Sequence, residues 1–419
     1  MSAWKLSPLA IALISAQSFA VQPVGVAMGS GFTFLPNVET SVESNDNIYA
    51  QESNVTSSSI TRIAPSFALK GDLGKLKLNS SYKLEQGIYD KNSDDDYIDQ
   101  NLNIDAGYEL NARNQFSVDA IYNVGHDARG SAKGGENTVS INPDEFNETT
   151  AGVGYTFGSA SAPLNLDLSA QSYQKRYDNN ENVTAGREYD KVSVKTKLSY
   201  TVSSATDLLI SVSSTDIDYV VASDREGSVN TVLMGASWDI SGATTGEFKI
   251  GLSEREFDQA GINTETNLNW EGNLTWQPLT YSTVSVVTSQ SGTESAGAGN
   301  FIDSSSTSVT WDHEYSNFYS AGINVNYGED NYENDPRNDI NTGFGVQATY
   351  SPQNFLDIKV SYDLEDRNVI DTLKQVKTIA LIGASSKPAR DSYKVMAFLM
   401  NEGYQVFPIN PLLAGTTIL

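Results

Sequence analysis

The segment LKLNSSYKLE, residues 76–85, alternates between two kinds of side chain. Leu76, Leu78, Tyr82 and Leu84 share one side of an extended chain with Ser80, and polar residues occupy the other side. Similar period-2 alternation recurs in about seventeen stretches, among them 102–108 and 192–200, with no helical stretch between them. The sequence therefore predicts one large antiparallel sheet that closes on itself.

The connections between these stretches alternate in length. Short turns rich in Gly, Pro, Asn and Ser, such as 71–74 and 203–206, alternate with longer acidic loops such as 125–145 and 328–339. This alternation is typical of barrels that cross the outer membrane, where only helices and closed barrels satisfy their backbone. We predict an all-β fold for residues 21–369, an antiparallel transmembrane β-barrel of about 17–18 strands.

Aromatic residues recur where the stretches meet their connections, as expected of rings at both membrane boundaries. Those before the short turns are Tyr108, Tyr155, Phe157, Tyr200, Trp238, Trp276, Tyr315 and Tyr350. Those near the long loops, predicted to form an outer ring or rim, are Tyr89, Tyr122, Tyr219, Phe257 and Tyr327.

The N-terminus and the composition suit an exported protein. Residues 1–20 form a predicted signal peptide, with Lys5, an apolar run and the small-x-small site at Ser18-Phe19-Ala20. The chain has no cysteine and a net charge of −25, and the acidic excess lies before residue 370. We expect no structural zinc site and no nucleic-acid partner, because there is no cysteine cluster and no basic patch.

Three segments carry a resemblance to a known family: SNDNIYA (44–50), SITRIAPSFAL (59–69) and the run 82–130. Over roughly residues 30–366 the chain resembles the outer-membrane β-barrel porins associated with bacterial exopolysaccharide genes. The resemblance implies a Gram-negative outer-membrane location, contact with lipid and lipopolysaccharide, and a part in polysaccharide export or assembly. It implies no catalytic residues.

The pattern changes in residues 370–419. An apolar strand at 376–382 precedes a Gly-led loop, a helix over 391–402 and a second strand at 405–409, which together predict a βαβ fragment. Residues 374–419 resemble the N-terminal part of small CoA-binding-domain proteins. By that resemblance CoA would be the only cofactor, and the residues facing it would be Gly383, Ala384, Ser385, Ser386, Lys387, Asn410 and Pro411.

The end of the barrel poses a problem of parity. If the stretch at 32–43 leaves the periplasm, the seventeenth, at 356–364, ends outside, and an even-numbered barrel needs one more descending strand. A strand of another type begins there instead, which suggests a fused reading frame and a poorly closed barrel. The rival prediction is that 377–382 is recruited to close it.

Inward positions of the predicted strands carry both signs of charge. The residues predicted to line the lumen are Lys83, Glu85, Asp105, Asp119, Asp167, Lys195, Lys197, Lys249, Glu271, Asp312, Asp357 and Lys359. They either tune a water-filled channel or pair across strands to fill the interior. The excess of acid favours cations.

Enzymatic chemistry has weak support in the sequence. The only histidines are His126, where a strand meets a long loop, and His313, which continues the apolar face of Trp311. Neither has the spacing of a Ser-His-acid triad, so we predict no catalytic site. The acidic loops at 93–96 and 330–335 lack the spacing of a calcium loop, so we predict no metal site.

These observations predict a porin-like barrel that passes solutes or assists exopolysaccharide export or assembly. The alternatives are a structural or assembly barrel without conductance, and a CoA- or nucleotide-binding protein acting through residues 374–419.

Overall fold

The computed structural model describes residues 25–51, 54–130, 142–159, 162–221, 224–240, 242–296 and 299–369, and, further along, 378–382, 390, 393–394, 396–397, 400 and 405–409. The predicted signal peptide lies outside these residues. No helix in this part of the chain is long and apolar enough to cross a membrane.

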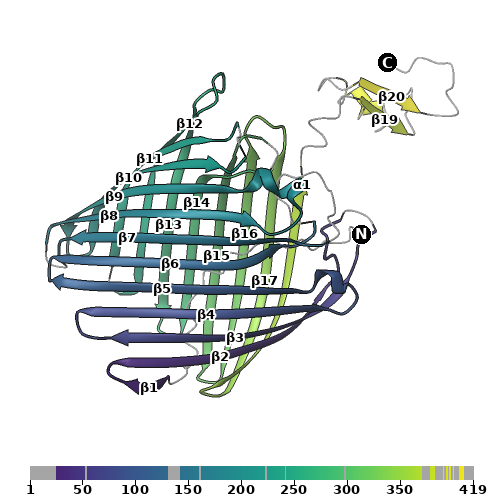
Figure 1. Cartoon of the computed structure of the whole chain (residues 1–419). Helices are drawn as coiled ribbons and strands as arrows, with labels where there is room; N and C mark the ends of the chain where they lie inside the picture. Colours follow the sequence, from purple (N-terminus) through teal and green to yellow (C-terminus); the bar gives the residue numbers. More distant parts are fainter. Residues whose placement is uncertain are drawn as a thin grey trace.

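One antiparallel sheet of 18 strands dominates the molecule and curves into a barrel (Figure 1). The strands are β1 (Val26–Gly29), β2 (Phe32–Asn45), β3 (Ser58–Asp72), β4 (Leu76–Tyr89), β5 (Tyr97–Asn111), β6 (Asn114–Asp127), β7 (Asp144–Phe157), β8 (Leu164–Tyr177), β9 (Tyr189–Ser203), β10 (Thr206–Tyr219), β11 (Gly227–Ile240), β12 (Thr244–Phe257), β13 (Glu265–Leu279), β14 (Ser282–Thr293), β15 (Ile302–Ser316), β16 (Tyr319–Tyr332), β17 (Asn338–Gln353) and β18 (Leu356–Val369). The predicted all-β antiparallel barrel is confirmed.

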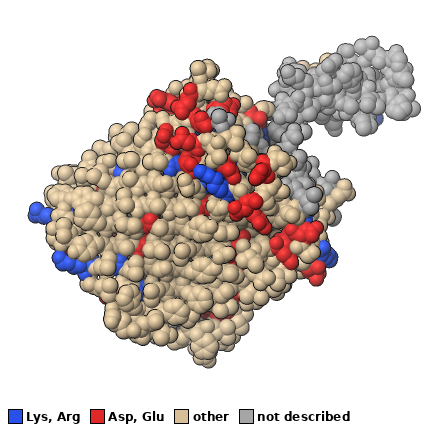
Figure 2. All heavy atoms as spheres, in the orientation of Figure 1, with Lys and Arg blue, Asp and Glu red and all other residues tan. Residues whose placement is uncertain are grey.

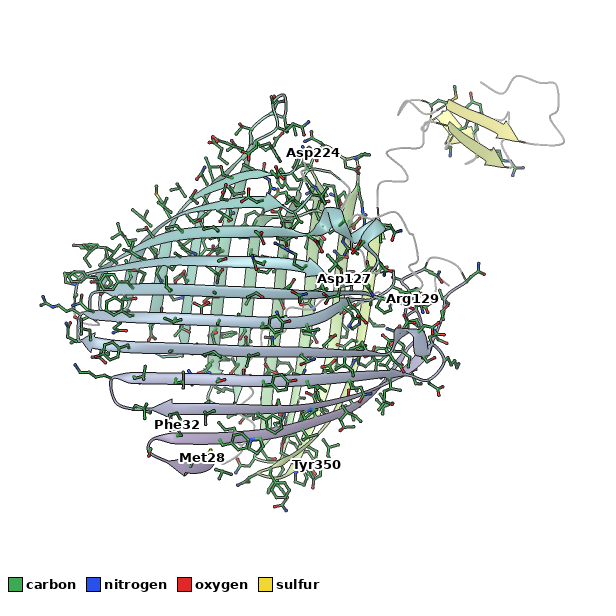
Figure 3. The ribbon with its side chains drawn as sticks, in the orientation of Figure 1. Met28, Phe32, Asp127, Arg129, Asp224 and Tyr350 are labelled. Atoms are coloured by element: carbon green, nitrogen blue, oxygen red, sulfur yellow. The ribbon has the colours of Figure 1, made fainter. Side chains whose placement is uncertain are left out.

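Short helices occupy two of the long connections. The 3-10 helix η1 (Ser93–Asp95) lies between β4 and β5, and α1 (Glu181–Thr184) with η2 (Ala185–Arg187) lies between β8 and β9. Figure 3 shows Asp127, Arg129 and Asp224 at this long-loop end, and Met28 and Phe32 at the short-turn end.

The two faces of the sheet follow directly from its register. Each strand from β1 to β18 pairs with its neighbour in sequence, so the alternation carries around the wall unbroken. Apolar side chains such as Met234 and Val360 stand exposed on one face, as a lipid-facing surface requires. Figure 2 shows this surface as a broad band with few charged atoms, with acidic residues gathered beyond it at the long-loop end.

The aromatic prediction holds in part. The aromatics before the short turns occupy outward positions, and Tyr315 and Tyr319 are among the most exposed. At the other end only Tyr122 and Tyr327 point outward, whereas Tyr89, Tyr219 and Phe257 share the register of the inner face. The prediction used only the place of each aromatic near a strand end, whereas its parity along the strand decides which face the ring occupies.

The wall bends sharply between β9 and β13, a stretch we call the bend. Lys195 on β9 reaches Glu271 on β13, with Nζ and Oε1 3.9 Å apart, although three strands separate them. Beneath this contact the inner side chains of Leu209, Leu233 and Lys249 are buried. Such a bend crowds the concave side: an added Cβ at Gly251 would lie 1.8 Å from the Val232 carbonyl oxygen.

The barrel edges meet at what we call the seam, between β18 and the β1–β2 hairpin. Glu43 on β2 acts electrostatically on Asp363 on β18, so the two edges face each other. Among the described residues, β18 forms a ladder only with β17, and β2 only with β1 and β3. The expectation of a poorly closed barrel therefore agrees with the strand pairing.

The alternation pattern does not predict the short strand β1. It pairs with Phe32–Phe34 at the start of β2, and no other described strand pairs with that edge of β2 beyond Phe34. Its four residues are too few to show alternation, although the Gly29-Ser30-Gly31 turn, with positive φ throughout, is a hairpin signal.

The rival prediction that residues 377–382 close the barrel is wrong. Strand β19 (Thr378–Ile382) pairs in parallel with β20 (Gln405–Ile409) in a separate two-stranded sheet. Residues 393, 394, 396, 397 and 400 between them are helical, as the predicted βαβ fragment requires. A continuous apolar run suits a parallel pair better than a barrel strand, which needs one polar face.

Candidate functional site

The inner face of the barrel holds every position predicted to line the lumen. The registers Asp105↔Asp119, Asp167↔Lys197 and Lys249↔Glu271 place these charges opposite one another on adjacent strands. Asp312 on β15 and Lys359 on β18 also occupy inward positions of their strands. The alternation therefore locates the residues, whereas their partners depend on strand register.

Most basic side chains of this wall pair with acids. Lys83 Nζ lies 2.8 Å from Glu85, Lys197 lies 3.7 Å from Asp167, and Lys249 lies 2.8 Å from both Glu247 and Glu271. Opposite charges on one face partly cancel, so the wall does not form a ring of a single sign. The pairing part of the second alternative is therefore present, and lining of a water-filled channel stays a prediction.

A polar chain runs across the inner wall from β2 to β5. Arg62 binds Glu43 and donates from Nε to the Tyr97 hydroxyl at 3.0 Å, and Tyr97 in turn donates to Glu85 at 2.9 Å. Arg62 lies in the segment 59–69, which resembles the porin family, but it is not among the predicted lumen residues. Its inward parity on β3 was the signal that could have identified it.

Next to this chain lies a recess of about 290 Å³ on the inner faces of β4–β7. Its lining side chains are Lys83, Glu85, Asp99, Asn101, Asn123, Phe146 and Glu148. Two of them, Lys83 and Glu85, were predicted lumen residues. The other residues come from three strands, β5, β6 and β7, which only the register brings together.

The histidines have structural partners. His126 Nδ1 lies 2.9 Å from Asp99 Oδ1, and its ring lies 4.1 Å from the Tyr97 ring. His313 packs among Tyr281, Trp311 and Tyr315 on the outward face near the short turns. In the described parts of the chain, no serine hydroxyl is hydrogen-bonded to either ring, so neither has the geometry of a triad.

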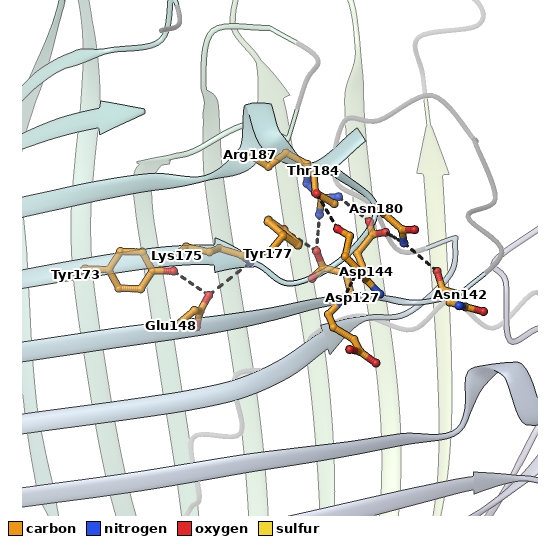
Figure 4. Close-up of polar contacts among 12 residues, drawn as sticks. Asp127, Asn142, Asp144, Glu148, Tyr173, Lys175, Tyr177, Asn180, Thr184 and Arg187 are labelled. Carbon is orange, nitrogen blue, oxygen red and sulfur yellow. Dashed lines mark hydrogen bonds and ion pairs between the residues drawn. The ribbon is translucent and has the colours of Figure 1, made fainter. Parts of the chain in front are cut away.

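The loop between β8 and β9 is tied to the rim of the barrel (Figure 4). Arg187 binds Asp144 at 2.8 Å and also binds Asp127, and Tyr177 donates its hydroxyl to Asp127 at 2.8 Å. Further down the wall, Tyr173 donates to Glu148 at 2.7 Å. The two contacts of Arg187 hold the loop at the mouth of the barrel.

A second tie joins three loops at the same end. Arg129 binds Asp95 in a two-pronged contact with both distances 2.6 Å, and the Tyr49 hydroxyl donates to Asp95 at 2.7 Å. Burial and the neighbouring Asp95 raise the pKa of Tyr49 to about 12. The phenol therefore remains a hydrogen-bond donor throughout the physiological range.

The connection after β14 carries a buried acid, Glu294. It accepts hydrogen bonds from Tyr219 at 2.7 Å and from both terminal nitrogens of Arg255, at 3.1 and 3.0 Å, and Lys191 lies 3.5 Å away. Burial alone would raise the pKa of Glu294, but Arg255 and Lys191 hold it below its usual value. We call these four residues the Glu294 cluster. It anchors the connection against the inner face at the long-loop ends of β9, β10 and β12.

The residues predicted to bind CoA lie outside the described residues. They are Gly383, Ala384, Ser385, Ser386, Lys387, Asn410 and Pro411. CoA binding there stays a prediction.

Comparison with known proteins gave two family matches. The model described as "Putative beta-barrel porin 2" matches residues 20–380, and that of the "CoA binding domain" matches residues 377–418. The end of the chain is therefore similar to CoA-binding domains, as the sequence resemblance implied.

Solved structures share the barrel fold at low identity. The FrpB iron transporter of Neisseria meningitidis (F5-1 variant) is 11% identical with a TM-score of 0.50, and the match covers 82% of this chain and 64% of that one. Pseudomonas aeruginosa OccK2 (OpdF), in complex with glucuronate, is 8% identical with a TM-score of 0.45, covering 80% and 92%. The chain thus spans less than two thirds of the length of the FrpB structures.

Proposed function

The chain belongs to this β-barrel porin family of the Gram-negative outer membrane, and on that premise we propose that it is a channel for small hydrophilic solutes. One observation carries the proposal: away from the buried leucines of the bend, the inner face is mostly polar, and its charges pair across strands. A barrel of about 18 strands encloses more space than wall side chains fill, so such a face is a water-lined one.

Conductance in planar bilayers tests the proposal. We expect steady open-channel steps in KCl from the refolded full chain. A barrel that inserts into liposomes, as protease protection would show, but conducts no current would instead be the structural or assembly barrel.

We propose a modest preference for cations. The inner wall is largely balanced in charge, while acidic residues gather at the outer end (Figure 2). Charges at a mouth attract ions over about a Debye length, roughly 10 Å at 0.1 M salt. The reversal potential in a KCl gradient should show a higher permeability for K⁺ than for Cl⁻ at low salt. At 1 M salt this difference should almost disappear.

A role in exopolysaccharide export or assembly is the finer proposal. Its support is the resemblance of residues 30–366 to barrels associated with exopolysaccharide genes. Deleting the gene should lower secreted polysaccharide without lowering the cell-associated pool. Unchanged secretion would leave only the general channel. Contact with lipopolysaccharide and with export proteins belongs to the same proposal, and we assign no covalent reaction to the barrel.

CoA binding is a separate candidate, supported by the family match at 377–418 and by the parallel β19–β20 pair. Calorimetry of the full chain with CoA tests it. Heat that disappears in the Lys387→Ala variant would support the candidate, and absence of heat would remove it.

A further inference from the structure

The recess between β4 and β7 is built like a binding site. Its volume of about 290 Å³ equals the room of roughly ten water molecules at about 30 Å³ each. It opens on the inner face, since its lining residues Glu85, Asp99, Asn101 and Asn123 share the inward parity of β4–β6. A solute passing along this wall would meet it.

The acids of the recess already have partners within the chain. Glu85 binds Lys83 and Tyr97, and Asp99 binds His126. Glu148 accepts from Tyr173 and lies 3.4 Å from Lys175. Because lysines face two of these three acids, a cation gains less there than at a cluster of unpaired carboxylates.

The same acids still have oxygen atoms available to a ligand. The side chains of Glu85, Asp99 and Glu148 are 25%, 34% and 22% exposed. A carboxylate has about four acceptor positions, and one or two protein contacts do not use them all. The recess therefore offers hydrogen-bond acceptors while lysines offset most of its negative charge.

Amides supply the complementary donors and acceptors. Asn101 donates to Asn123, and Asn103 donates to Asn101, forming a row across β5 and β6. Each amide has two donor hydrogens and an acceptor oxygen, which suits vicinal hydroxyl groups that both donate and accept.

An aromatic ring borders the polar row. Phe146 lies opposite Gly125 in the register, and a Cβ at position 125 would stand 3.1 Å from the ring Cζ. Gly125 thus lets the ring lie close against the wall. A ring edge beside a few placed polar groups is the usual composition of a small-molecule pocket.

We propose that this recess binds a neutral polyhydroxylated ligand the size of one sugar ring. The inference deepens the proposed channel function and rests on it for access. Two of the three acids are paired with lysines, which weakens the attraction for cations. The amide row and the free acceptor positions match hydroxyl groups, and the Phe146 ring borders the apolar side of such a ligand.

The test measures binding directly, apart from conductance. Saturation-transfer NMR on the refolded full chain in detergent would use D-glucose as probe, with CaCl2 as the rival ligand. We expect saturable glucose binding that calcium does not displace. The variants Asn123→Leu and Phe146→Ala should each weaken it at least tenfold, and fold is checked by heat-modifiable migration in SDS gels.

The matched control is Asn326→Leu, an inward amide on β16, which does not line the recess. Its glucose binding should equal that of the original chain. The proposal is overturned by absence of saturable binding, by binding that Asn123→Leu leaves intact, or by calcium binding that glucose cannot displace. Glucose binding without conductance would instead refute the channel alone.

Discussion

The barrel wall departs from a smooth cylinder at both the bend and the seam. The two places differ in backbone pairing, which among the described residues is complete at the bend and one-sided at the seam. At the bend, every strand from β9 to β13 has a partner on both edges. At the seam, the described residues pair β18 on one side only. Side chains reinforce the contrast, because Lys195 meets Glu271 at the bend whereas Glu43 faces Asp363 at the seam.

The contrast teaches that sheet topology, more than side-chain chemistry, decides where the wall is weak. β2 and β18 both run from the short-turn end to the long-loop end, so a strand that closes the seam with antiparallel ladders must run the other way. Another copy in the same orientation offers the same two edges, and β1 provides only four residues of a descending strand.

The largest effect should come from supplying that strand. We would replace residues 370–419 by a turn and a descending strand of about ten residues that alternates apolar and polar side chains. Unpaired backbone groups in a bilayer cost several kcal/mol each, so the free energy of unfolding should rise by more than about 5 kcal/mol. Urea unfolding in lipid vesicles measures it.

A shuffled strand of the same composition is the control for that experiment, since it lacks a lipid-facing side. Truncation after Val369 is a second control and should leave the urea midpoint unchanged, because in the described part of the chain β19 pairs only with β20. A large loss on truncation would show that the C-terminal segment does close the seam.

The next largest loss of stability should come from breaking the contact between Arg255 and Glu294 at the long-loop end of the bend. Arg255→Met removes the two-nitrogen contact to Glu294 and leaves a carboxylate whose side chain is 4% exposed. Breaking one partner of a buried pair costs about 3–5 kcal/mol. The urea midpoint should fall accordingly, while Arg176→Met, whose ion pair with Asp190 is about one third exposed, should cost less than about 1 kcal/mol. Equal losses would mean that burial does not set the strength of the bend.

The same cluster predicts a dependence on pH. The pKa of Glu294 is lowered in the folded chain, so its contribution is present above the unfolded value and is lost as pH falls through the folded one. Unfolding of the original chain and of Glu294→Gln should therefore differ at pH 7 and converge in acid. A gap that widens below pH 4 would contradict this assignment.

Glycine substitution separates curvature from chemistry. Gly251→Ala places a methyl group 1.8 Å from a backbone oxygen of β11, so the strands must shift, at a cost of about 1–3 kcal/mol. Gly107→Ala is the matched control, an inward glycine on β5 with nothing within 4 Å of the added atom. Similar midpoints for the two variants would show that the bend does not depend on its glycine.

The order of the strands, the face that each side chain occupies and the outer-membrane location could be predicted from the sequence. Period-2 alternation and loop length are local signals. The predicted strand at 356–364 is β18, and Lys249 and Glu271 fall on the face expected for them. Pairing was beyond such reasoning, since Lys195 meets Glu271 only through curvature. Glu294 was not predicted as a site residue, and Tyr219 was predicted only as a rim aromatic, because their contact depends on how the connection after β14 folds back onto the wall.

The smallest effect should come from the seam charges themselves. Asp363→Asn removes one of two like charges that face each other across it, yet Asp363 is exposed to the lumen and Glu43 already binds Arg62. Screened, exposed charges contribute less than about 1 kcal/mol, so stability should rise only slightly, and less at high salt. A gain as large as that from an added strand would mean that repulsion, rather than the missing ladder, keeps the seam apart. The experiment therefore compares the two causes directly, with the urea midpoint at low and high KCl as its readout.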